Sequence, residues 1–340
     1  MARRSKLAAV ALVVVVAAIA ASAVVLRQGL RCAGFAGPGV TPGELPPPVP
    51  AGHLRLATWN LRNFPLDERA QDPELGFARQ TNICDLSDAL AGLEADVIGF
   101  AEIGDARRFP PVLRRAAGER SYQVVLSRYG GRWGQRLAIA WDGRVLEAVG
   151  QPVEVREVAV DEEERPGLAL RLRSRSDQDL QFTVLQVHLK ASPRGHAVRM
   201  EQHRAIVDWV ERWTANAGGQ GLVVMGDFNT TGSERGTAEE ELEAVDGMYL
   251  AVGMRRLASA NGCSEYWEGG GEPDGVQQPS LLDHLWVRGL GDELPAARSW
   301  LHCERYGCGP LVSRPGEEDG TFWDVSDHCP LTVDLPWPAR

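Results

Sequence analysis

Four apolar segments of this chain, each as long as a typical β-strand, lead into a polar side chain. They cover residues 54–59, 97–101, 182–187 and 222–225, and they lead into Asn60, Glu102, His188 and Asp227. Strands of one sheet that carry functional residues at their ends bring those residues to a shared rim. The pattern therefore predicts a sheet with carboxylate, amide and imidazole groups along one edge.

Helices and further strands are expected between these segments. Apolar residues recur at helical spacing from Ile83 to Leu93, and a second helix is expected from His196 to Trp213, with Arg199 and Gln202 on its surface. Further strands are expected at 137–141, 153–158, 168–172 and 281–287. Because strands and helices alternate irregularly, we expect mixed sheets. The acidic run 161–164 is interpreted as a solvated hairpin tip.

The N-terminal segment predicts export or a membrane anchor. An apolar run from Leu7 to Leu26 follows basic residues and, at about 20 residues, is long enough to span a bilayer. Ala21-Ser22-Ala23 also offers a cleavage site. We expect a signal peptide or membrane anchor at 1–26, a Pro/Gly-rich linker at 27–51 and one domain at 52–337. The protein would then be periplasmic, extracellular or anchored to a membrane.

Charge and cysteine content narrow the classes of function. A net charge of −10 argues against nucleic-acid binding through a broad basic surface, but it leaves room for a local basic groove. The 6 cysteines form no CxxC pair, so a structural zinc site is not expected. If the domain is exported, Cys303 and Cys308 could pair with each other or with Cys263. Cys329 is expected to be a small buried apolar residue.

Two polar motifs carry the chemistry, and they are Gly-Asp-Phe-Asn at 226–229 and Ser-Asp-His-Cys-Pro at 326–330. Carboxylate, amide and imidazole groups together suit metal-assisted attack on a phosphate ester. Glu102, Asp327 and Asn60 offer hard oxygen ligands for Mg²⁺ or Mn²⁺, with Ca²⁺ as a further option. His328 can take a proton from water, and Asp283 is a suitable partner for its second ring nitrogen.

Six short motifs give the chain a resemblance to the endonuclease/exonuclease/phosphatase superfamily, which includes deoxyribonuclease I. In order, they lie at 57–60, 101–103, 187–190, 226–229, 282–284 and 326–328. The resemblance covers nearly the whole domain and implies an α/β fold, a four-layer sandwich of two packed mixed β-sheets flanked by helices. It also implies a divalent metal, with Glu102 as principal ligand and with Asn60 and Asp327 completing or supporting the site.

The resemblance further implies the catalytic roles. Asp227 and Asn229 would orient the nucleophile and contact phosphate. Asp283 would pair with His328 as the general base. His188 would contact phosphate or assist the leaving group.

One departure from the family pattern concerns His188. In the deoxyribonuclease branch, a glutamate on an earlier strand orients the equivalent histidine, but the region 127–141 holds no acidic residue. Arg136 stands where that carboxylate is expected and could bind substrate phosphate as a bidentate donor. Lys190 could steer a phosphate-rich substrate, or it could simply lie in a solvated loop.

These features predict an exported or membrane-tethered, metal-dependent phosphodiesterase. The leading hypothesis is a monomeric endonuclease that acts on nucleic acid, because arginines between 128 and 136 could line a groove. DNA is expected as its substrate ahead of RNA. The alternative is a sphingomyelinase-like or inositol-phosphate phosphoesterase, since one scaffold serves many substrates. Tyr266 and Trp267 in a Gly-rich loop favour lipid. A non-catalytic binding module is disfavoured by the complete set of acid, amide and histidine residues.

Overall fold

A computed structural model describes residues 40–65, 81–118, 120–217, 220–269, 274–291, 294–312 and 319–337. The predicted helices are present, as α2 (Ile83–Leu93) and as α4 (His196–Asn216), which runs slightly further than expected. The expected signal peptide or anchor at 1–26 lies outside the described residues. Among the helices of the described ranges, none has both the length and the apolar character to cross a bilayer.

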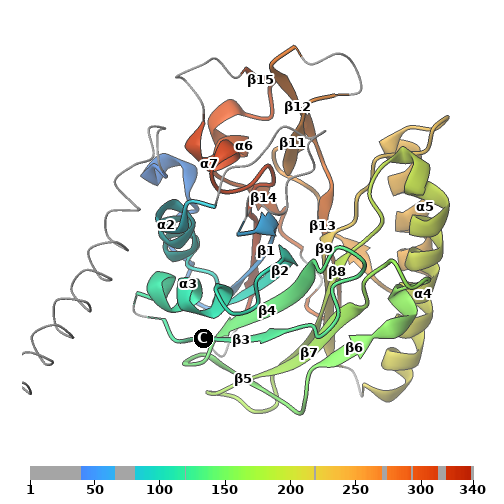
Figure 1. The fold of residues 1–340 in the computed structure, drawn as a ribbon. Helices are drawn as coiled ribbons and strands as arrows, with labels where there is room; N and C mark the ends of the chain where they lie inside the picture. Colours follow the sequence, from blue (N-terminus) through green and yellow to red (C-terminus); the bar gives the residue numbers. More distant parts are fainter. Residues whose placement is uncertain are drawn as a thin grey trace, which may run out of the picture.

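Two mixed β-sheets form the centre of the domain, as predicted (Figure 1). The first sheet has the order β14-β16-β1-β2-β4-β3, with strands Arg298–Ser299, Leu331–Pro336, His53–Phe64, Val97–Ile103, Arg136–Asp142 and Tyr122–Leu126. The second has the order β10-β13-β9-β8-β7-β5, with strands Arg255–Arg256, Asp283–Arg288, Gly221–Asp227, Gln181–His188, Gly167–Ser174 and Leu146–Ala148. β6 (Val153–Val155) pairs with β7 at its edge, and a 3-10 turn (Arg156–Val158) takes up the rest of the strand expected at 153–158.

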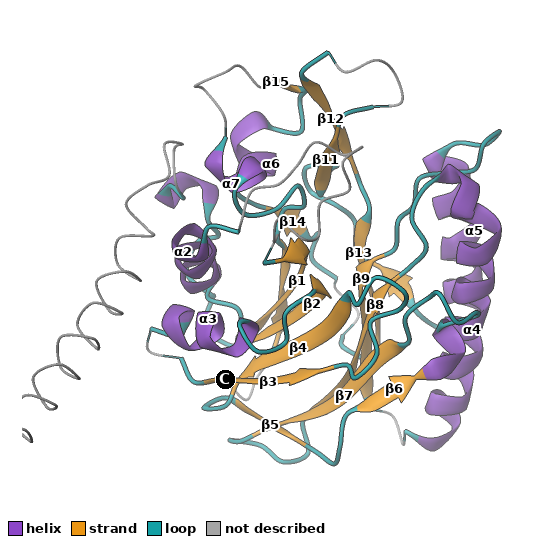
Figure 2. Ribbon diagram, viewed as in Figure 1, coloured by secondary structure: helices purple, strands orange, loops and turns teal. Residues whose placement is uncertain are grey.

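Helices cover the outer face of each sheet, which completes four layers (Figure 2). α2 and α3 (Phe109–Ala116) pack on the first sheet, and α4 and α5 (Ala238–Ala251) pack on the second. Three apolar clusters follow from this layering: one between the sheets and one under each helical layer. Burial of these faces drives the stacking, because each sheet is apolar on both sides.

A smaller unit flanks the two sheets and is held by disulfides. It contains a three-stranded sheet of β11 (Glu265–Trp267), β12 (Val276–Ser280) and β15 (Leu311–Val312), with short helices α6 (His302–Tyr306) and α7 (Gly320–Trp323) (Figure 1). Cys263 bonds to Cys308, which was one of the pairings left open. Cys329 is buried, as expected, but it forms a disulfide with Cys303, which was not predicted.

The surface assignment of Arg199 and Gln202 was also wrong. Both side chains are 0% exposed, since this face of α4 meets α5 and the loops that follow β8 and β9. The Arg199 guanidinium pairs with Glu241 of α5, with Nε 2.6 Å from Oε1, and Gln202 Oε1 accepts from the Lys190 backbone N–H at 2.8 Å. Partners that lie far away in the sequence thus allow polar residues to be buried.

The described part of the expected linker, residues 40–51, packs against the domain. Residues Pro42–Glu44 form a 3-10 turn. The backbone N–H of Leu301 donates to the Glu44 carbonyl at 2.9 Å, and Arg305 pairs with the Glu44 carboxylate. The Pro47 carbonyl accepts a hydrogen bond from the Arg55 guanidinium at 2.8 Å.

Candidate active site

The register of the second sheet places three of the predicted residues side by side. β8 runs parallel to β9 with His188 opposite Asp227, and β13 runs antiparallel to β9 with Asp283 opposite Asp227. Residues opposite each other on neighbouring strands point to the same face of a sheet. Gly226 allows this close approach, because a Cβ there would lie 2.0 Å from the Val187 carbonyl oxygen. The three side chains therefore share one end of the sheet.

Asn60 of the first sheet reaches across to this cluster. Its Nδ2 donates to Glu102 Oε1 at 3.1 Å and to Asp227 Oδ2 at 3.0 Å. The Asn60 amide thus holds two carboxylates that would otherwise repel each other. The second oxygen of Glu102 accepts from the Asn63 backbone N–H at 2.8 Å. The residues were expected along one edge of a single sheet, and this was wrong, because β1 and β2 belong to the first sheet and β8 and β9 to the second. The side chains nevertheless come together, across the space between the two sheets.

Glu102 sits at an irregular point in its strand. Its φ is 61°, a left-handed conformation that is uncommon for a residue other than glycine, and the β2–β4 register shifts there. Burial and the nearby Asp327 carboxylate raise the pKa of Glu102 above its ordinary value. Asp327 lies half-buried, and its Oδ1 accepts from Ser326 Oγ at 3.4 Å. Strained backbone of this kind is frequent where a site must hold a side chain in place.

His328 and Asp283 form the pair that the sequence predicted. Nδ1 of His328 lies 2.8 Å from Asp283 Oδ2, which leaves Nε2 directed toward Asp227, 3.7 Å from Oδ2. Burial alone would lower the pKa of His328, but the carboxylates of Asp283 and Asp227 outweigh it and raise that pKa well above its ordinary value. Hydrogen bonds from Trp59 Nε1 to the His328 carbonyl at 2.8 Å and from the His328 N–H to Ser326 Oγ at 3.1 Å fix the backbone.

Asp227 and Asn229 form a tight turn after β9. Burial raises the pKa of Asp227 to about 7, with His328 acting against this shift and Asp283 adding to it. Asp227 Oδ1 accepts from the Asn229 backbone N–H at 2.9 Å, and Asn229 adopts a left-handed φ of 50°. The Asn229 amide donates to the Leu189 carbonyl at 3.1 Å, which ties this turn to the end of β8.

His188 is buried beside Glu102 and Asp227. Burial and the nearby Arg165 hold its pKa well below the ordinary value for histidine. Its Nε2 lies 3.6 Å from Glu102 Oε1 and 3.5 Å from Asp227 Oδ2. Its Nδ1 finds no hydrogen-bond partner among the described residues. This agrees with the missing glutamate noted in the sequence.

The two predicted substrate-binding residues lie outside the carboxylate cluster. Arg136 begins β4 opposite Ile103, next to Glu102, and its Nε donates to the Arg128 carbonyl at 3.4 Å. Lys190 Nζ lies 2.7 Å from Glu164 Oε1. Glu164 is 2% exposed, so the interpretation of the acidic run 161–164 as a solvated tip was wrong for its last residue.

Arg165 belongs to the site but was not found from the sequence. It is 7% exposed, and its Nη1 lies 3.4 Å from the His188 carbonyl. Burial lowers the pKa of Arg165, and the carboxylates of Glu102, Glu164 and Asp227 act against this shift. Because it directly follows the run 161–164, its sequence context resembles a solvated turn. No local pattern marks it.

Glu265 is a further buried acid that no motif contains. It is 7% exposed, and burial raises its pKa well above the ordinary value. The charges of Asp327, Asp227, Asp283 and His328 all act on it. The sequence alone does not place Glu265 in the site. Its position there becomes clear only once its strand is known to pair with the segment around His328.

The donor set fits a hard divalent cation. The carboxylates of Glu102, Asp227, Asp283 and Asp327 meet here, and Asp283 Oδ1 is buried without a hydrogen-bond partner among the described residues. No three of these carboxylates offer oxygens that all lie within 4.8 Å of one another in the described ranges. Mg²⁺ typically uses one or two carboxylates and keeps several waters, which suits such an open arrangement.

A tighter group of ligand types lies beside the site but is not available to a metal. In the described ranges, His302, Cys303 and Cys329 form the one set of three such residues whose ligand atoms lie within 4.8 Å of one another. The two sulfurs are joined in a disulfide, so they cannot act as thiolate ligands.

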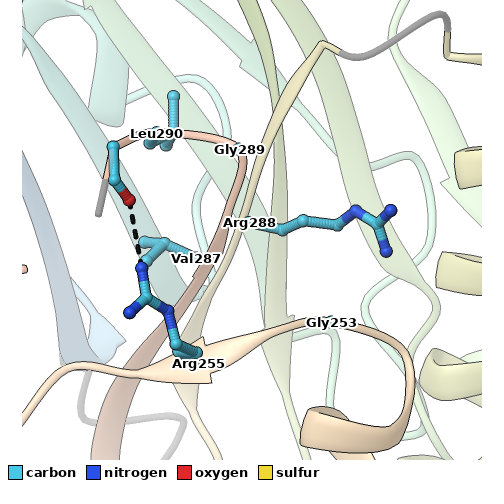
Figure 3. A pocket seen from close by; sticks show the side chains of 7 residues that line it. Gly253, Arg255, Val287, Arg288, Gly289 and Leu290 are labelled. Carbon is cyan, nitrogen blue, oxygen red and sulfur yellow. Dashed lines mark hydrogen bonds between the residues drawn. The ribbon is translucent and has the colours of Figure 1, made fainter.

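A separate surface pocket lies at the opposite end of β13 (Figure 3). Arg288 ends the strand that Asp283 begins, and Arg255 lies on the neighbouring β10. The two guanidinium groups extend to opposite sides of the pocket (Figure 3), and Arg255 Nη2 donates to the Gly291 carbonyl at 3.0 Å.

Comparisons with known proteins agree on the fold. The model of a family described as "Endonuclease/Exonuclease/phosphatase family" matches residues 57–328. Among solved structures, the catalytic domain of human Nocturnin with bound sulfate is similar with a TM-score of 0.55 and 18% identity, over 83% of this chain and 93% of that one. Truncated TDP2 from Caenorhabditis elegans is similar with a TM-score of 0.53 and 16% identity, over 83% of this chain and 97% of that one.

A mannosyl-6-phosphatase from Bacteroides thetaiotaomicron is also similar, with a TM-score of 0.54 and 14% identity, over 83% of this chain and 99% of that one. At such low identity these likenesses show the fold alone. No curated protein matches the sequence. The substrates of these structures therefore say nothing direct about this chain.

Proposed function

Because this chain belongs to the endonuclease/exonuclease/phosphatase family, we propose that it is a divalent-metal-dependent phosphodiesterase that cleaves nucleic acid as an endonuclease. The observation that carries the proposal is the contact of 2.8 Å between Asp283 and His328, beside the buried carboxylate of Asp227. This arrangement supplies an oriented base and a group to position water in one place.

Each residue of the cluster has a chemical task in this proposal. His328 Nε2 takes the proton of the attacking water, while Asp283 holds the opposite ring nitrogen and stabilises the imidazolium. Asp227, 3.7 Å from that Nε2, accepts a hydrogen bond from the same water. Glu102, Asn60 and Asp327 would hold Mg²⁺ or Mn²⁺, which when bound neutralises charge on the phosphate.

His188 and Arg165 would stabilise the leaving group and the phosphate. The lowered pKa of His188 favours the neutral imidazole, whose Nε2–H can donate to the departing oxygen in this proposal. The Arg165 guanidinium always carries its charge and lies against the His188 carbonyl, where it can donate to a phosphate oxygen. Arg136 at the rim remains in our proposal as a second phosphate contact.

The loop between β3 and β4 supports nucleic acid as the substrate. Trp133 and Tyr129 are 74% and 46% exposed, and the Arg132 guanidinium lies 5.4 Å from the Trp133 ring. The Gln135 side chain ties this loop to Asn63 at 2.7 Å, and Asn63 donates to Glu102. Exposed aromatics interleaved with arginines are typical of surfaces that stack bases and track a phosphate backbone.

A lipid phosphodiesterase is the second candidate, because Trp267 is 47% exposed. Its neighbour Tyr266 is 1% exposed and donates to the Gly309 carbonyl at 2.9 Å, so only half of the expected aromatic pair faces solvent. This favours nucleic acid over lipid. Export, with or without a membrane anchor at 1–26, also remains our proposal, and two disulfides in the domain support an oxidising location.

The substrate is tested by incubating the protein with plasmid DNA, RNA and sphingomyelin in Mg²⁺. We expect nicking of plasmid DNA, and a loss of about tenfold or more in Trp133→Ala, because base stacking contributes about 1–3 kcal/mol per base. Val153→Ala is a matched surface control, since Val153 is another exposed apolar side chain. Cleavage of sphingomyelin without cleavage of either nucleic acid would replace this proposal with the lipid candidate.

The pH dependence of the reaction follows from the raised pKa of His328. A general base must start neutral, so kcat/KM should rise with pH along a limb that lies above the ordinary histidine range. Removing the Asp283 charge lowers the pKa of His328, so Asp283→Asn should move this limb to lower pH. It should also lower the plateau by about 10²–10⁴-fold, because the ring loses its orientation. A limb that stays in place would show that His328 is not the titrating base.

A further inference from the structure

The start of β13, which carries Asp283, has a strand neighbour on one of its edges only. On the side of β9, the Phe228 N–H donates to the Leu282 carbonyl at 2.9 Å, so Asp283 and Asp227 form a non-hydrogen-bonded pair. The Asp283 N–H therefore points away from β9. On that outer edge, the pairs between β13 and β10 end at Trp286, further along the strand. Strand β10 therefore does not cover the N–H of Asp283.

Ser264 supplies an acceptor on this open edge. Its Oγ accepts from the Leu282 N–H at 3.0 Å and from the Asp283 N–H at 2.9 Å. The residue is 0% exposed, so the contact is closed to bulk water. Leaving a buried N–H group without an acceptor is costly, and one hydroxyl prevents this at two positions. The Ser264 side chain therefore fixes the backbone of Asp283.

The main chain of Ser264 holds the segment that carries the other member of the pair. Its carbonyl accepts from the Cys329 N–H at 2.8 Å, and the Tyr266 N–H donates to the Asp327 carbonyl at 3.1 Å. These two bonds lie on either side of His328. Ser264 therefore contacts both segments of the proposed base, one through its hydroxyl and one through its carbonyl.

The backbone of Ser264 is itself firmly held. Cys263, which directly precedes it, bonds to Cys308, and Cys329, whose N–H it binds, bonds to Cys303. The Ser264 N–H donates to the carbonyl of the last residue of β12 at 2.7 Å. The hydroxyl therefore belongs to a well-anchored part of the chain.

The Asp283 carboxylate depends on its backbone for its position. Its Oδ2 lies 2.8 Å from His328 Nδ1, whereas its Oδ1 makes no hydrogen bond to any described residue. A carboxylate with one hydrogen bond shifts when its main chain shifts. A displacement of about 1 Å is enough to lower the rate of an enzyme by about 10²-fold.

We propose that Ser264 is a positioning residue for the Asp283–His328 pair. Its hydroxyl keeps the Asp283 carboxylate in line with His328 Nδ1, and its carbonyl keeps the segment of His328 beside that carboxylate. The inference rests on the proposed function, in which this pair supplies the general base. It adds a residue that none of the sequence motifs contains and that acts only through the pair.

The proton on His328 Nδ1 reports this role without any substrate. A proton held between an imidazole and a carboxylate gives a ¹H NMR signal far downfield of the amide protons, and its loss in His328→Gln assigns it in the whole chain. We expect Ser264→Ala to lose this signal or to move it upfield. Ser259→Ala is the matched control and should keep it, because the Ser259 Oγ accepts only a loop N–H, that of Gly262, at 3.0 Å.

A matched pair of variants separates the oxygen of Ser264 from the shape of its side chain. Threonine and valine differ chiefly in the hydroxyl, which only threonine keeps. Ser264→Thr should retain the downfield signal, and Ser264→Val should lose it. Equal signals in these two variants, or a wild-type signal that persists unchanged in Ser264→Ala, would overturn the role of Ser264.

Steady-state kinetics supply a second readout. We expect Ser264→Ala to lower kcat for phosphodiester cleavage by about 10–10²-fold with KM nearly unchanged, at a temperature well below its melting point. Ser264→Thr should restore most of this loss. A serine with a merely structural role would lower the melting temperature on replacement and leave kcat as in wild type.

The possible failures are distinct. If the downfield signal depended on Ser264 but wild type cleaved no phosphodiester in Mg²⁺, Ser264 would still position the pair and the proposed function would fall. If His328→Ala abolished cleavage while Ser264→Ala kept both the signal and kcat, the function would stand and the role of Ser264 would fall. A wild-type chain without the signal would contradict the held pair itself.

Discussion

His328→Ala is expected to lower kcat for phosphodiester cleavage by about 10²–10⁴-fold, the usual contribution of a positioned general base. The imidazole is held by Asp283 at 2.8 Å and by backbone contacts on both sides, so no other described side chain can replace it. His188, the other histidine in the cluster, is engaged on the far side of Asp227. KM should change little, because His328 acts on water.

The measurement is steady-state cleavage of a defined oligonucleotide duplex in Mg²⁺. His196→Ala, a partly exposed histidine at the start of α4, is the matched control and should keep wild-type kcat. Unchanged melting temperature in both variants would show that the loss is chemical. Full activity of His328→Ala on every phosphodiester tested would contradict the mechanism.

The second large effect concerns stability. Arg199→Met is expected to lower the free energy of unfolding by about 3–5 kcal/mol, because it leaves the Glu241 carboxylate buried and unpaired. Arg199 is 0% exposed and donates to both Glu241 oxygens, at 2.6 and 2.8 Å. It also donates to the carbonyls of Lys190 and Ser192 at 2.9 Å and of Gly232 at 2.8 Å.

Those carbonyls connect Arg199 to catalysis. Lys190 and Ser192 follow His188 at the end of β8, and Gly232 follows Asn229 after β9. The Arg199 guanidinium therefore connects the loop after β8 to the loop after β9, next to the predicted catalytic residues His188 and Asn229. Arg199→Lys should not restore stability, because an ammonium group cannot reproduce five donors in a planar fork.

Urea unfolding followed by circular dichroism measures this loss. Arg204→Ala, on the exposed face of the same helix, is the control and should stay within about 0.5 kcal/mol of wild type. A loss of less than about 1 kcal/mol in Arg199→Met would mean that the buried pair contributes little beyond an apolar contact.

Local patterns were sufficient to predict most of the fold and much of the site. The strand segments ending at Asn60, Glu102, His188 and Asp227 are strands of two sheets, and the two parallel pairs β1–β2 and β8–β9 bring their ends together. The end of a buried strand fixes where its side chain lies, at the edge of the sheet. The type of that residue therefore indicates its chemical role. The contact between Asp283 and His328 was predicted from residue type and family pattern alone.

What could not be predicted depends on contacts between distant segments. Arg199 and Gln202 have polar side chains on a helix, and only α5 and the loop after β8 make their burial possible. Glu164 ends an acidic run that is typical of solvated turns and Arg165 follows it, yet Lys190 pairs with Glu164 and the His188 carbonyl accepts from Arg165. Glu265 enters the site only because a separate strand pairs with the His328 segment. Disulfide connectivity has the same origin.

The most direct test of metal-dependent phosphodiester hydrolysis at this site is cleavage of plasmid DNA by wild-type protein before chelation, after EDTA and after addition of excess Mg²⁺. We predict cleavage, then its loss, then its return, and no cleavage at any stage by Glu102→Gln. Cleavage that continues undiminished in EDTA, or that survives in Glu102→Gln, would contradict the account.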